Sequence, residues 1–203
     1  MNIKICGIFR DEDIDYINEA RPDYIGFVFA KSRREVSPGQ AARLRQRLTE
    51  GIAVVGVFVN ASVEDIAALY RDGVISLAQL HGTEDEAYIG RLKEESGSAP
   101  IPVIKVFRSE ELEWEIPVTK GADYYLIDSG AGSGKPFNWG LLNSLKIEKP
   151  WFLAGGINMD NIEKAMAFNP FAIDVSSGAE TSGVKDRNKI VQLTAIIRKG
   201  NIV

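Results

Sequence analysis

The sequence predicts an α/β fold, a single (β/α)8 TIM barrel in which eight parallel strands alternate with helices and the fifth helix is degenerate. Eight apolar, β-rich runs have ends about 21–30 residues apart, close to the length of a strand plus a crossover helix. Several runs are almost continuously apolar, which favours strands covered on both faces, as in a parallel sheet. Eight such units fill about 200 residues without an extra segment, which favours a closed barrel.

The eight predicted strands coincide with the apolar runs. They cover 2–6, 24–29, 53–59, 75–80, 102–107, 124–128, 151–155 and 171–177. The rival architecture is an open, doubly wound sheet. The glycine-rich dinucleotide fingerprint that such a sheet carries after its first strand is absent, because "CGIFRDED" (6–13) holds a single glycine. We therefore expect the barrel.

Helix start signals lie between most of the strands. Ser37-Pro38 supplies an N-cap followed by a proline at the first helical position. Ser62 to Asp65 and Thr83 to Glu86 have the spacing of a capping box. A proline interrupts the interval 109–121, so that only a turn or two of helix is expected there. The last helix is expected over about 186–198.

Length and composition indicate one globular domain that spans residues 1–203. The chain has 45% hydrophobic and 26% charged residues and no linker rich in proline, serine and glycine. Its net charge of -4 offers no basic field for nucleic acid or for a membrane surface. We therefore expect a small-molecule ligand and neither nucleic acid nor membrane as a partner.

The cysteine content and the distribution of apolar residues predict the compartment. A single cysteine excludes an intramolecular disulfide and fits a reducing environment. No basic stretch followed by an apolar run opens the sequence, and no apolar segment approaches the roughly 18 residues of a membrane span. We expect a cytoplasmic protein. We also expect a monomer, because no exposed apolar helix face is evident.

Polar side chains mark the C-terminal ends of the predicted strands, where barrels gather their chemistry. Cys6 ends the first strand, Arg33 lies in the loop after the second and His81 follows the fourth. Asp128 ends the sixth strand, and Asp174 lies in the eighth. These five residues are candidates for a site at the mouth of the barrel.

The loops after the last two strands predict a phosphate-binding site. Gly155 and Gly156 follow the seventh strand, and Ser176, Ser177 and Gly178 follow the eighth. Barrels commonly bind phosphate through backbone N–H groups of these two loops, and glycine permits close approach of the backbone to the anion. Two ordinary glycine turns are the simpler interpretation. The presence of both motifs in the expected loops favours a phosphate-bearing ligand.

Cys6 and Asp128 can move protons. Strands 1 and 6 are not neighbours, so the two residues would lie on opposite sides of the barrel mouth with a small phosphorylated substrate between them. Such a pair can supply a base and an acid to one substrate. The thiol is a base only as thiolate, which the positive charge of Lys4, two residues away, would favour. The carboxyl must hold a proton, which partial desolvation would favour.

Simpler roles for these residues stay open at this point. Cys6 could be a small buried hydrophobe, because free cysteine is among the most buried residue types. Asp128 could begin a loop and accept hydrogen bonds from backbone N–H groups. His81, the only histidine, could be structural or could orient a ligand. One histidine and one cysteine without a matching cluster predict no metal site.

The motifs together identify a resemblance to a known family. The chain resembles phosphoribosylanthranilate isomerase, an enzyme of tryptophan biosynthesis, over essentially its whole length. The matching stretches are "KICGI" (4–8), "GFVF" with "SRREV" (26–36), "VGVFVN" (55–60), "QLHG" (79–82), "LIDSGAGSGKPFNW" (126–139), "LAGGIN" (153–158) and "DVSSGAE" with "GVKD" (174–186). The chain departs from a common Gly-Thr-Gly core in the loop after strand 6, where Ser133 keeps the hydroxyl.

The resemblance implies a role for each matching residue. Cys6 is implied as the general base and Asp128 as the general acid. Arg33, with Arg34 as the alternative, is implied to contact the anthranilate carboxylate. The glycines and serines at 155–156 and 176–178 are implied to hold the phosphate, and Asp174 and His81 match positions near the site. The implied reaction is an Amadori rearrangement that needs no cofactor and no metal.

Three other functions are weighed against this one. A barrel isomerase that acts on a histidine-pathway phosphoribosyl aminoimidazole is similar in reaction but typically uses two aspartates, and Cys6 replaces the first. Indoleglycerol-phosphate synthase needs a lysine and glutamate pair that the sequence does not place. A non-catalytic sensor of a phosphorylated ligand would need no proton-transfer pair.

Overall fold

The computed structural model describes residues 1–112, 116–128 and 139–200, and its centre is a closed barrel of parallel strands. The strands are paired in sequence order, and β8 closes the barrel against β1. They are β1 (Asn2–Cys6), β2 (Tyr24–Val28), β3 (Ala53–Phe58), β4 (Leu77–Leu80), β5 (Val103–Arg108), β6 (Tyr124–Asp128), β7 (Trp151–Ala154) and β8 (Ala172–Val175). The predicted barrel and all eight predicted strands are confirmed.

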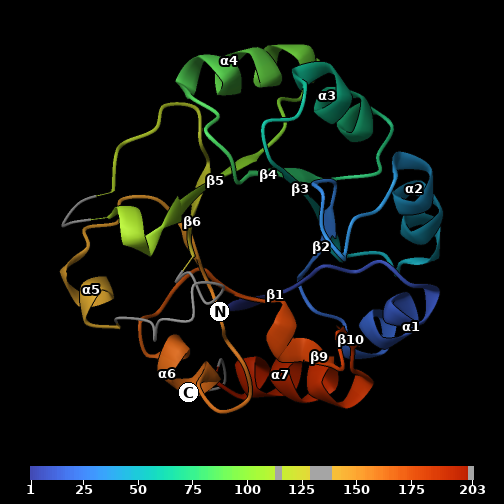
Figure 1. The fold of residues 1–203 in the computed structure, drawn as a ribbon, viewed down its shortest axis with the longest axis vertical. Helices are drawn as coiled ribbons and strands as arrows, with labels where there is room; N and C mark the ends of the chain where they lie inside the picture. Colours follow the sequence, from blue (N-terminus) through green and yellow to red (C-terminus); the bar gives the residue numbers. More distant parts are fainter. Residues whose placement is uncertain (113–115, 129–138, 201–203) are drawn as a thin grey trace.

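Helices surround the ring of strands (Figure 1). They are α1 (Asp11–Ala20), α2 (Pro38–Arg47), α3 (Val63–Arg71), α4 (Glu86–Glu95), α5 (Trp139–Ser144), α6 (Ile162–Met166) and α7 (Arg187–Lys199). Within the described residues, the interval between β5 and β6 holds only the 3-10 helix η1 (Ser109–Glu111), which confirms a degenerate fifth helix. A second 3-10 helix, η2 (Ser177–Ala179), follows β8.

A short hairpin precedes the last helix. Its strands, β9 (Glu180–Thr181) and β10 (Val184–Lys185), pair antiparallel outside the barrel. The hairpin could not be predicted from the sequence, because two-residue strands carry no recognisable period. The hairpin lies beside η2 and brings charged side chains of the "GVKD" segment to the back of the loop after β8.

Two of the predicted helix starts are confirmed and one is wrong. The hydroxyls of Ser37 and Ser62 accept hydrogen bonds from backbone N–H groups three residues on and cap α2 and α3. The capping box predicted at Thr83 does not form. The N–H and hydroxyl of Thr83 instead donate to Asn60 Oδ1, which holds this residue in the loop before the helix. Asp85 caps α4 through the N–H of Tyr88.

Alternate residues of each strand build two separate apolar layers. One set, with Ile3 and Ile5 from β1, packs between the barrel and the helices. The other set fills the barrel interior and comprises Val55, Leu77, Ile104, Val106, Leu126, Phe152, Ala154 and Ala172. Because side chains alternate along a strand, every second residue after these interior positions also points to the barrel axis, and the last of them lie near the C-terminal end of the barrel. This alternation positions the candidate site.

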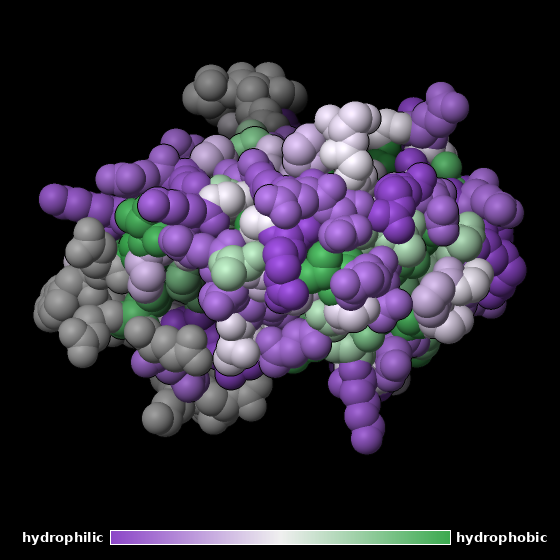
Figure 2. Space-filling view, turned by 90° about the horizontal axis from the view of Figure 1, so that it is seen from above, coloured by the Kyte–Doolittle hydropathy of each residue, from purple (hydrophilic) through white to green (hydrophobic). Residues whose placement is uncertain are grey.

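The outer surface of the protein is polar over much of the face seen in Figure 2, with apolar residues between the hydrophilic ones. Large apolar side chains that are well exposed in the described residues are Val59 and Val118. No helix among the described residues is long and apolar enough to cross a membrane.

Candidate active site

A cavity of about 400 Å³ opens at the C-terminal end of the barrel. Eight of the ten residues proposed from the sequence line it: Cys6, His81, Asp128, Gly155, Gly156, Asp174, Ser176 and Ser177. Arg33 and Gly178 are the two that do not. The barrel therefore brings together residues that are separated by up to 171 positions in the sequence, as far apart as Cys6 and Ser177.

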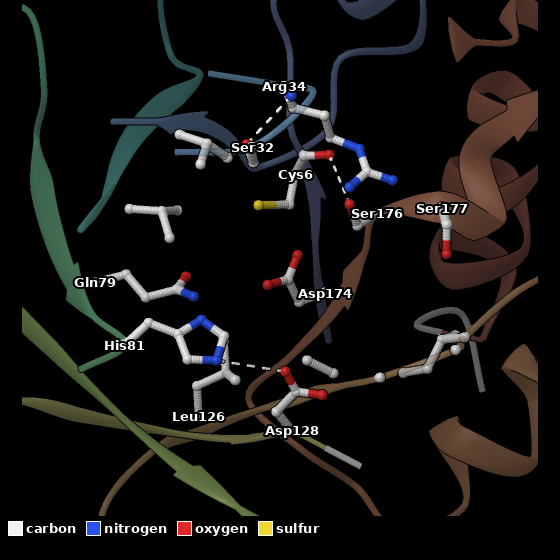
Figure 3. A pocket seen from close by; sticks show the side chains of 16 residues that line it. Cys6, Ser32, Arg34, Gln79, His81, Leu126, Asp128, Asp174, Ser176 and Ser177 are labelled. Carbon is white, nitrogen blue, oxygen red and sulfur yellow. Dashed lines mark hydrogen bonds and ion pairs between the residues drawn. The ribbon is translucent and has the colours of Figure 1, made fainter. Parts of the chain in front are cut away.

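Cys6 ends β1 with its sulfur directed into the cavity (Figure 3). The residue is 9% exposed, so the thiol is sheltered but reachable from the cavity. Gly26 pairs with Cys6 in the register of β1 and β2, and a Cβ at position 26 would lie 2.7 Å from the sulfur. The glycine in an otherwise apolar strand thus makes room for the thiol. Cys6 therefore lines the cavity and does not pack in the apolar core.

The charges around Cys6 act in opposite directions on its thiol. Burial raises the pKa of the Cys6 thiol above its ordinary value, and the ammonium groups of Lys4 and Lys185 oppose this rise. The carboxylate of Asp174 adds to it. The net effect is a raised pKa, so that the thiol form dominates at neutral pH in the absence of a ligand.

Asp174 lies in β8 opposite Lys4 of β1 and faces the same cavity. Its Oδ2 accepts a hydrogen bond of 2.7 Å from Lys4 Nζ, which also donates to Gln79 Oε1 at 2.9 Å. Its Oδ1 is buried and has no hydrogen-bond partner among the described residues. A buried carboxylate oxygen without a partner is costly, so this atom is a candidate acceptor for a ligand hydroxyl.

Asp128 enters the cavity from β6, across the barrel mouth from Cys6 (Figure 3). Its Oδ2 lies 3.5 Å from Nε2 of His81, which follows β4. About a quarter of each side chain is exposed, so both groups are reachable by a ligand. Residues 129–138, which hold the glycine-rich motif that follows β6 in the sequence, lie outside the described residues.

The loops after β7 and β8 form another wall. Gly155 and Gly156 have φ angles of 95° and 64°, in the left-handed region that favours glycine, and they line the cavity with backbone. Ser176 and Ser177 line it from the neighbouring loop. Gly178 lies behind them, where any Cβ would collide with the backbone carbonyl of Ile157. Gly178 therefore lets the two loops pack together and does not face the cavity.

The structure separates the two adjacent arginines of the loop after β2. Arg34 lines the cavity with its side chain 19% exposed, whereas Arg33 lies outside the lining with its side chain 56% exposed. Both guanidinium groups bind Glu180, at 2.6 Å in each case. Arg34, the alternative to Arg33 for the carboxylate contact, is therefore the arginine that faces the cavity. The spacing alone could not choose between two adjacent arginines, because the loop conformation decides which side chain turns inward.

Glu180 and Lys185 are site-supporting residues that the sequence analysis missed. Burial acts to raise the pKa of Glu180, but hydrogen bonds from Arg34 and Lys185 outweigh it and lower the pKa below its ordinary value. Lys185 Nζ donates to Glu180 Oε1 at 2.7 Å and to the carbonyl of Ser176 at 3.0 Å. Together, Glu180 and Lys185 connect the loop after β2, which carries Arg34, to the loop after β8, which carries Ser176. The sequence signal that could have identified them is that Glu180 lies in the "GAE" motif and Lys185 in the "GVKD" motif.

No group of three or more His, Cys, Asp or Glu residues that could hold a metal ion occurs within 1–112, 116–128 and 139–200. The ionisable groups that line the cavity are a thiol, two carboxylates, an imidazole and a guanidinium, and the amide of Gln79 and serine hydroxyls lie beside them. This set can bind anions and hydroxyl groups and can transfer protons.

Comparison with known proteins decides the family. Residues 3–195 match the profile of a family described as N-(5'phosphoribosyl)anthranilate (PRA) isomerase. The chain belongs to this family. The resemblance predicted from the motifs is thereby confirmed, and membership makes the chain an isomerase of tryptophan biosynthesis.

Individual relatives agree with this assignment along nearly the whole chain. The N-(5'-phosphoribosyl)anthranilate isomerase of Endomicrobium trichonymphae is 47% identical over 202 residues, which cover 97% of this chain and 98% of the relative. The relative from Clostridium acetobutylicum is 42% identical over 211 residues and covers 98% of each chain.

Solved structures of the family share the barrel. The phosphoribosyl anthranilate isomerase of Thermus thermophilus is 32% identical, with a TM-score of 0.79 over 98% of this chain and 99% of that one. Another isomerase structure, 29% identical with a TM-score of 0.77 over 98% and 99% of the two chains, is a complex with reduced 1-(o-carboxyphenylamino)-1-deoxyribulose 5-phosphate.

Proposed function

We propose that the chain converts N-(5'-phosphoribosyl)anthranilate to 1-(2-carboxyphenylamino)-1-deoxyribulose 5-phosphate, with Cys6 as general base and Asp128 as general acid. The observation that carries this proposal is the placement of a thiol and a carboxyl on opposite walls of one cavity whose further wall is glycine and serine backbone. An aldose-to-ketose conversion needs one group that gives a proton and one that removes a proton. The cavity offers both groups to one small ligand.

The first step opens the sugar ring. Asp128, protonated at the start, gives its proton to the furanose ring oxygen while the bond from this oxygen to C1 breaks. The nitrogen lone pair forms a double bond to C1, which leaves a protonated Schiff base and an ionised carboxylate. His81, 3.5 Å from Asp128 Oδ2, is placed to orient the carboxyl and to stabilise it as an anion.

The second step moves a proton from carbon. Cys6, as thiolate, removes the C2 proton. The electron pair of the C2–H bond forms a C1=C2 double bond, and the π pair of the C1=N bond returns to the nitrogen, which gives a neutral enolamine. C1 then gains a proton and the C2 hydroxyl loses one, which gives the ketone; the proton held by the Cys6 thiol and the ionised carboxylate of Asp128 balance this exchange and return both groups to their starting states. The whole sequence relocates hydrogen within the substrate, so that no electrons are exchanged with another molecule.

The remaining residues of the cavity hold the substrate. Two glycines and two serines, Gly155, Gly156, Ser176 and Ser177, form the phosphate cradle. Arg34 binds the anthranilate carboxylate, because it is the arginine that lines the cavity. Asp174 Oδ1, buried and unpartnered among the described residues, accepts a hydrogen bond from a ribose hydroxyl.

The rival functions lack a comparable observation. The related aminoimidazole isomerase typically pairs two aspartates, whereas the first position here is Cys6. A non-catalytic sensor would explain the phosphate cradle but would leave two proton-transfer groups in the cavity without a purpose. We also propose that residues 1–203 act as one catalytic domain. The expectations of a monomer and of a cytoplasmic location stay predictions.

The test is a turnover assay with the purified protein and no additives. Loss of phosphoribosylanthranilate is followed by its fluorescence and compared with spontaneous decay in buffer, and the phosphoribosyl aminoimidazole substrate is assayed in parallel. We expect rapid consumption of the anthranilate compound alone. Consumption of the aminoimidazole compound alone would favour the related isomerase. Tight binding of phosphoribosylanthranilate with decay at the spontaneous rate would favour the sensor.

A further inference from the structure

A buried cation inside the barrel has no part in the proton transfers described above. Lys4 is completely buried in the middle of β1, on the same inner face as Cys6. Its ammonium donates to Asp174 Oδ2 at 2.7 Å and to Gln79 Oε1 at 2.9 Å. These partners lie on β8 and β4, so three strands converge on one charge beneath the cavity.

Stability alone does not account for this arrangement. Removing two charges from water costs free energy that their attraction often fails to recover, and apolar side chains of similar size are commonly as stable in such positions. The interior below Lys4 is filled by such side chains. Asp174 also leaves its Oδ1 without a partner among the described residues. A buried pair that is kept in spite of this cost indicates a task at the cavity.

We propose that Lys4 is a positioning residue of the isomerase: its ammonium, held by Asp174 and Gln79, is the fixed positive charge that makes the Cys6 thiolate attainable. This inference rests on the proposed function, in which the thiolate removes the C2 proton. Lys4 touches no reacting atom in this account. It acts through the sulfur two residues further along its own strand.

The charges that act on the sulfur come from four segments, and among the cations Lys4 is the one on the same strand as Cys6, where Asp174 and Gln79 hold it. Arg34, in the loop after β2, and Lys185, on β10, are both bound to Glu180. Asp174, on β8, is negative and disfavours the thiolate. Lys4 therefore opposes, in part, both the burial of the sulfur and the nearby carboxylate.

This arrangement makes two predictions of opposite sign. Without the Lys4 charge, the thiol would face an uncompensated Asp174 carboxylate, and its pKa would rise further. Without the Asp174 charge, the ammonium would act on the sulfur alone, and the pKa of the thiol would fall. If Lys4 and Asp174 only supported the fold, replacing each of them in turn would not shift the pKa of the Cys6 thiol in opposite directions.

The test measures the rate at which iodoacetamide alkylates the protein as a function of pH. Cys6 is the only cysteine, so the rate reports its thiolate fraction without further labelling. The variants are Lys4→Met and Asp174→Asn. The control is Lys105→Met, because Lys105 is also a buried lysine on a barrel strand but binds Gly82 and Glu84.

We expect Lys4→Met to move the alkylation midpoint up by about one pH unit or more, which slows alkylation about tenfold at a fixed pH below it. Asp174→Asn should move the midpoint down, and Lys105→Met should leave it in place. In turnover, Lys4→Met should lower kcat about tenfold or more and change KM by less than about threefold.

Unchanged alkylation midpoints in both variants would overturn the proposal, even if turnover fell. Should Lys4→Met fail to fold, Asp174→Asn decides alone: a lowered midpoint supports the proposal, and an unchanged or raised midpoint overturns it. The alkylation needs no substrate. A wild-type protein that did not turn over phosphoribosylanthranilate would therefore overturn the proposed function, while the midpoints would still decide the role of Lys4.

Discussion

The two ends of the barrel are built from the same strands but from different kinds of side chain. At the N-terminal end, Phe152 lies at the centre of an aromatic cluster, with ring centroids 5.6 Å from Tyr24, 5.8 Å from Tyr124 and 5.7 Å from Phe171. At the C-terminal end, alternation along the same strands brings thiol, carboxyl and imidazole groups to a cavity. β6 shows the change within five residues, from Tyr124 to Asp128.

The difference teaches how stability and chemistry are divided in this molecule. Aromatic and aliphatic side chains need only shape and volume to pack, so the lower end can be stable without specific partners. A buried polar group at the upper end needs a specific hydrogen-bond partner, and Lys4 finds such partners in Asp174 and Gln79. Substitutions at the lower end should therefore act on unfolding, and those at the upper end on turnover.

The largest expected effect on stability is at the lower end. Phe152→Ala removes a fully buried ring from the centre of the aromatic cluster and should lower the free energy of unfolding by about 3–5 kcal/mol. Urea denaturation monitored by circular dichroism measures this change. At a temperature where the variant is folded, kcat should stay within about twofold of the wild type. A large loss of kcat in the fully folded variant would break the proposed division between the two ends.

A smaller effect is expected from the two adjacent arginines at the upper end. Arg34→Ala should raise KM about 10–100-fold, because the variant loses a charged contact to the substrate carboxylate. Arg33→Ala is the matched control, since it removes the same group from the same carboxylate, Glu180, but from outside the cavity. It should change KM by less than about twofold. Steady-state kinetics compares the two, and an equal rise in both variants would remove the assignment of Arg34.

The fold could be predicted from the sequence because its signals are local and repeated. Eight apolar runs at the spacing of strand and helix units leave few architectures, and a proline in the fifth interval predicts the degenerate helix. The predicted start at Thr83 was wrong, because a contact with Asn60, in another loop, overrides the local capping signal. The β9–β10 hairpin was missed because its strands are too short to show a pattern.

The site could be predicted in outline, because barrels collect the ends of their strands at one mouth. That rule places Cys6, Asp128 and the two loops of the proposed phosphate cradle in one cavity. It could not choose Arg34 over Arg33, because the conformation of the loop decides the direction of each side chain. Nor could it predict the pairing of Lys4 with Asp174, because this depends on the register of β1 against β8.

The most direct test of the central claim, that Cys6 and Asp128 act on one bound substrate, compares turnover and binding in Cys6→Ser and Asp128→Asn. Isothermal titration with reduced 1-(o-carboxyphenylamino)-1-deoxyribulose 5-phosphate measures binding, and the fluorescence assay measures kcat. Each variant should lose about 10²–10⁴-fold in kcat, while the Kd of the analogue should change by less than about tenfold. Wild-type kcat in either variant would contradict the account.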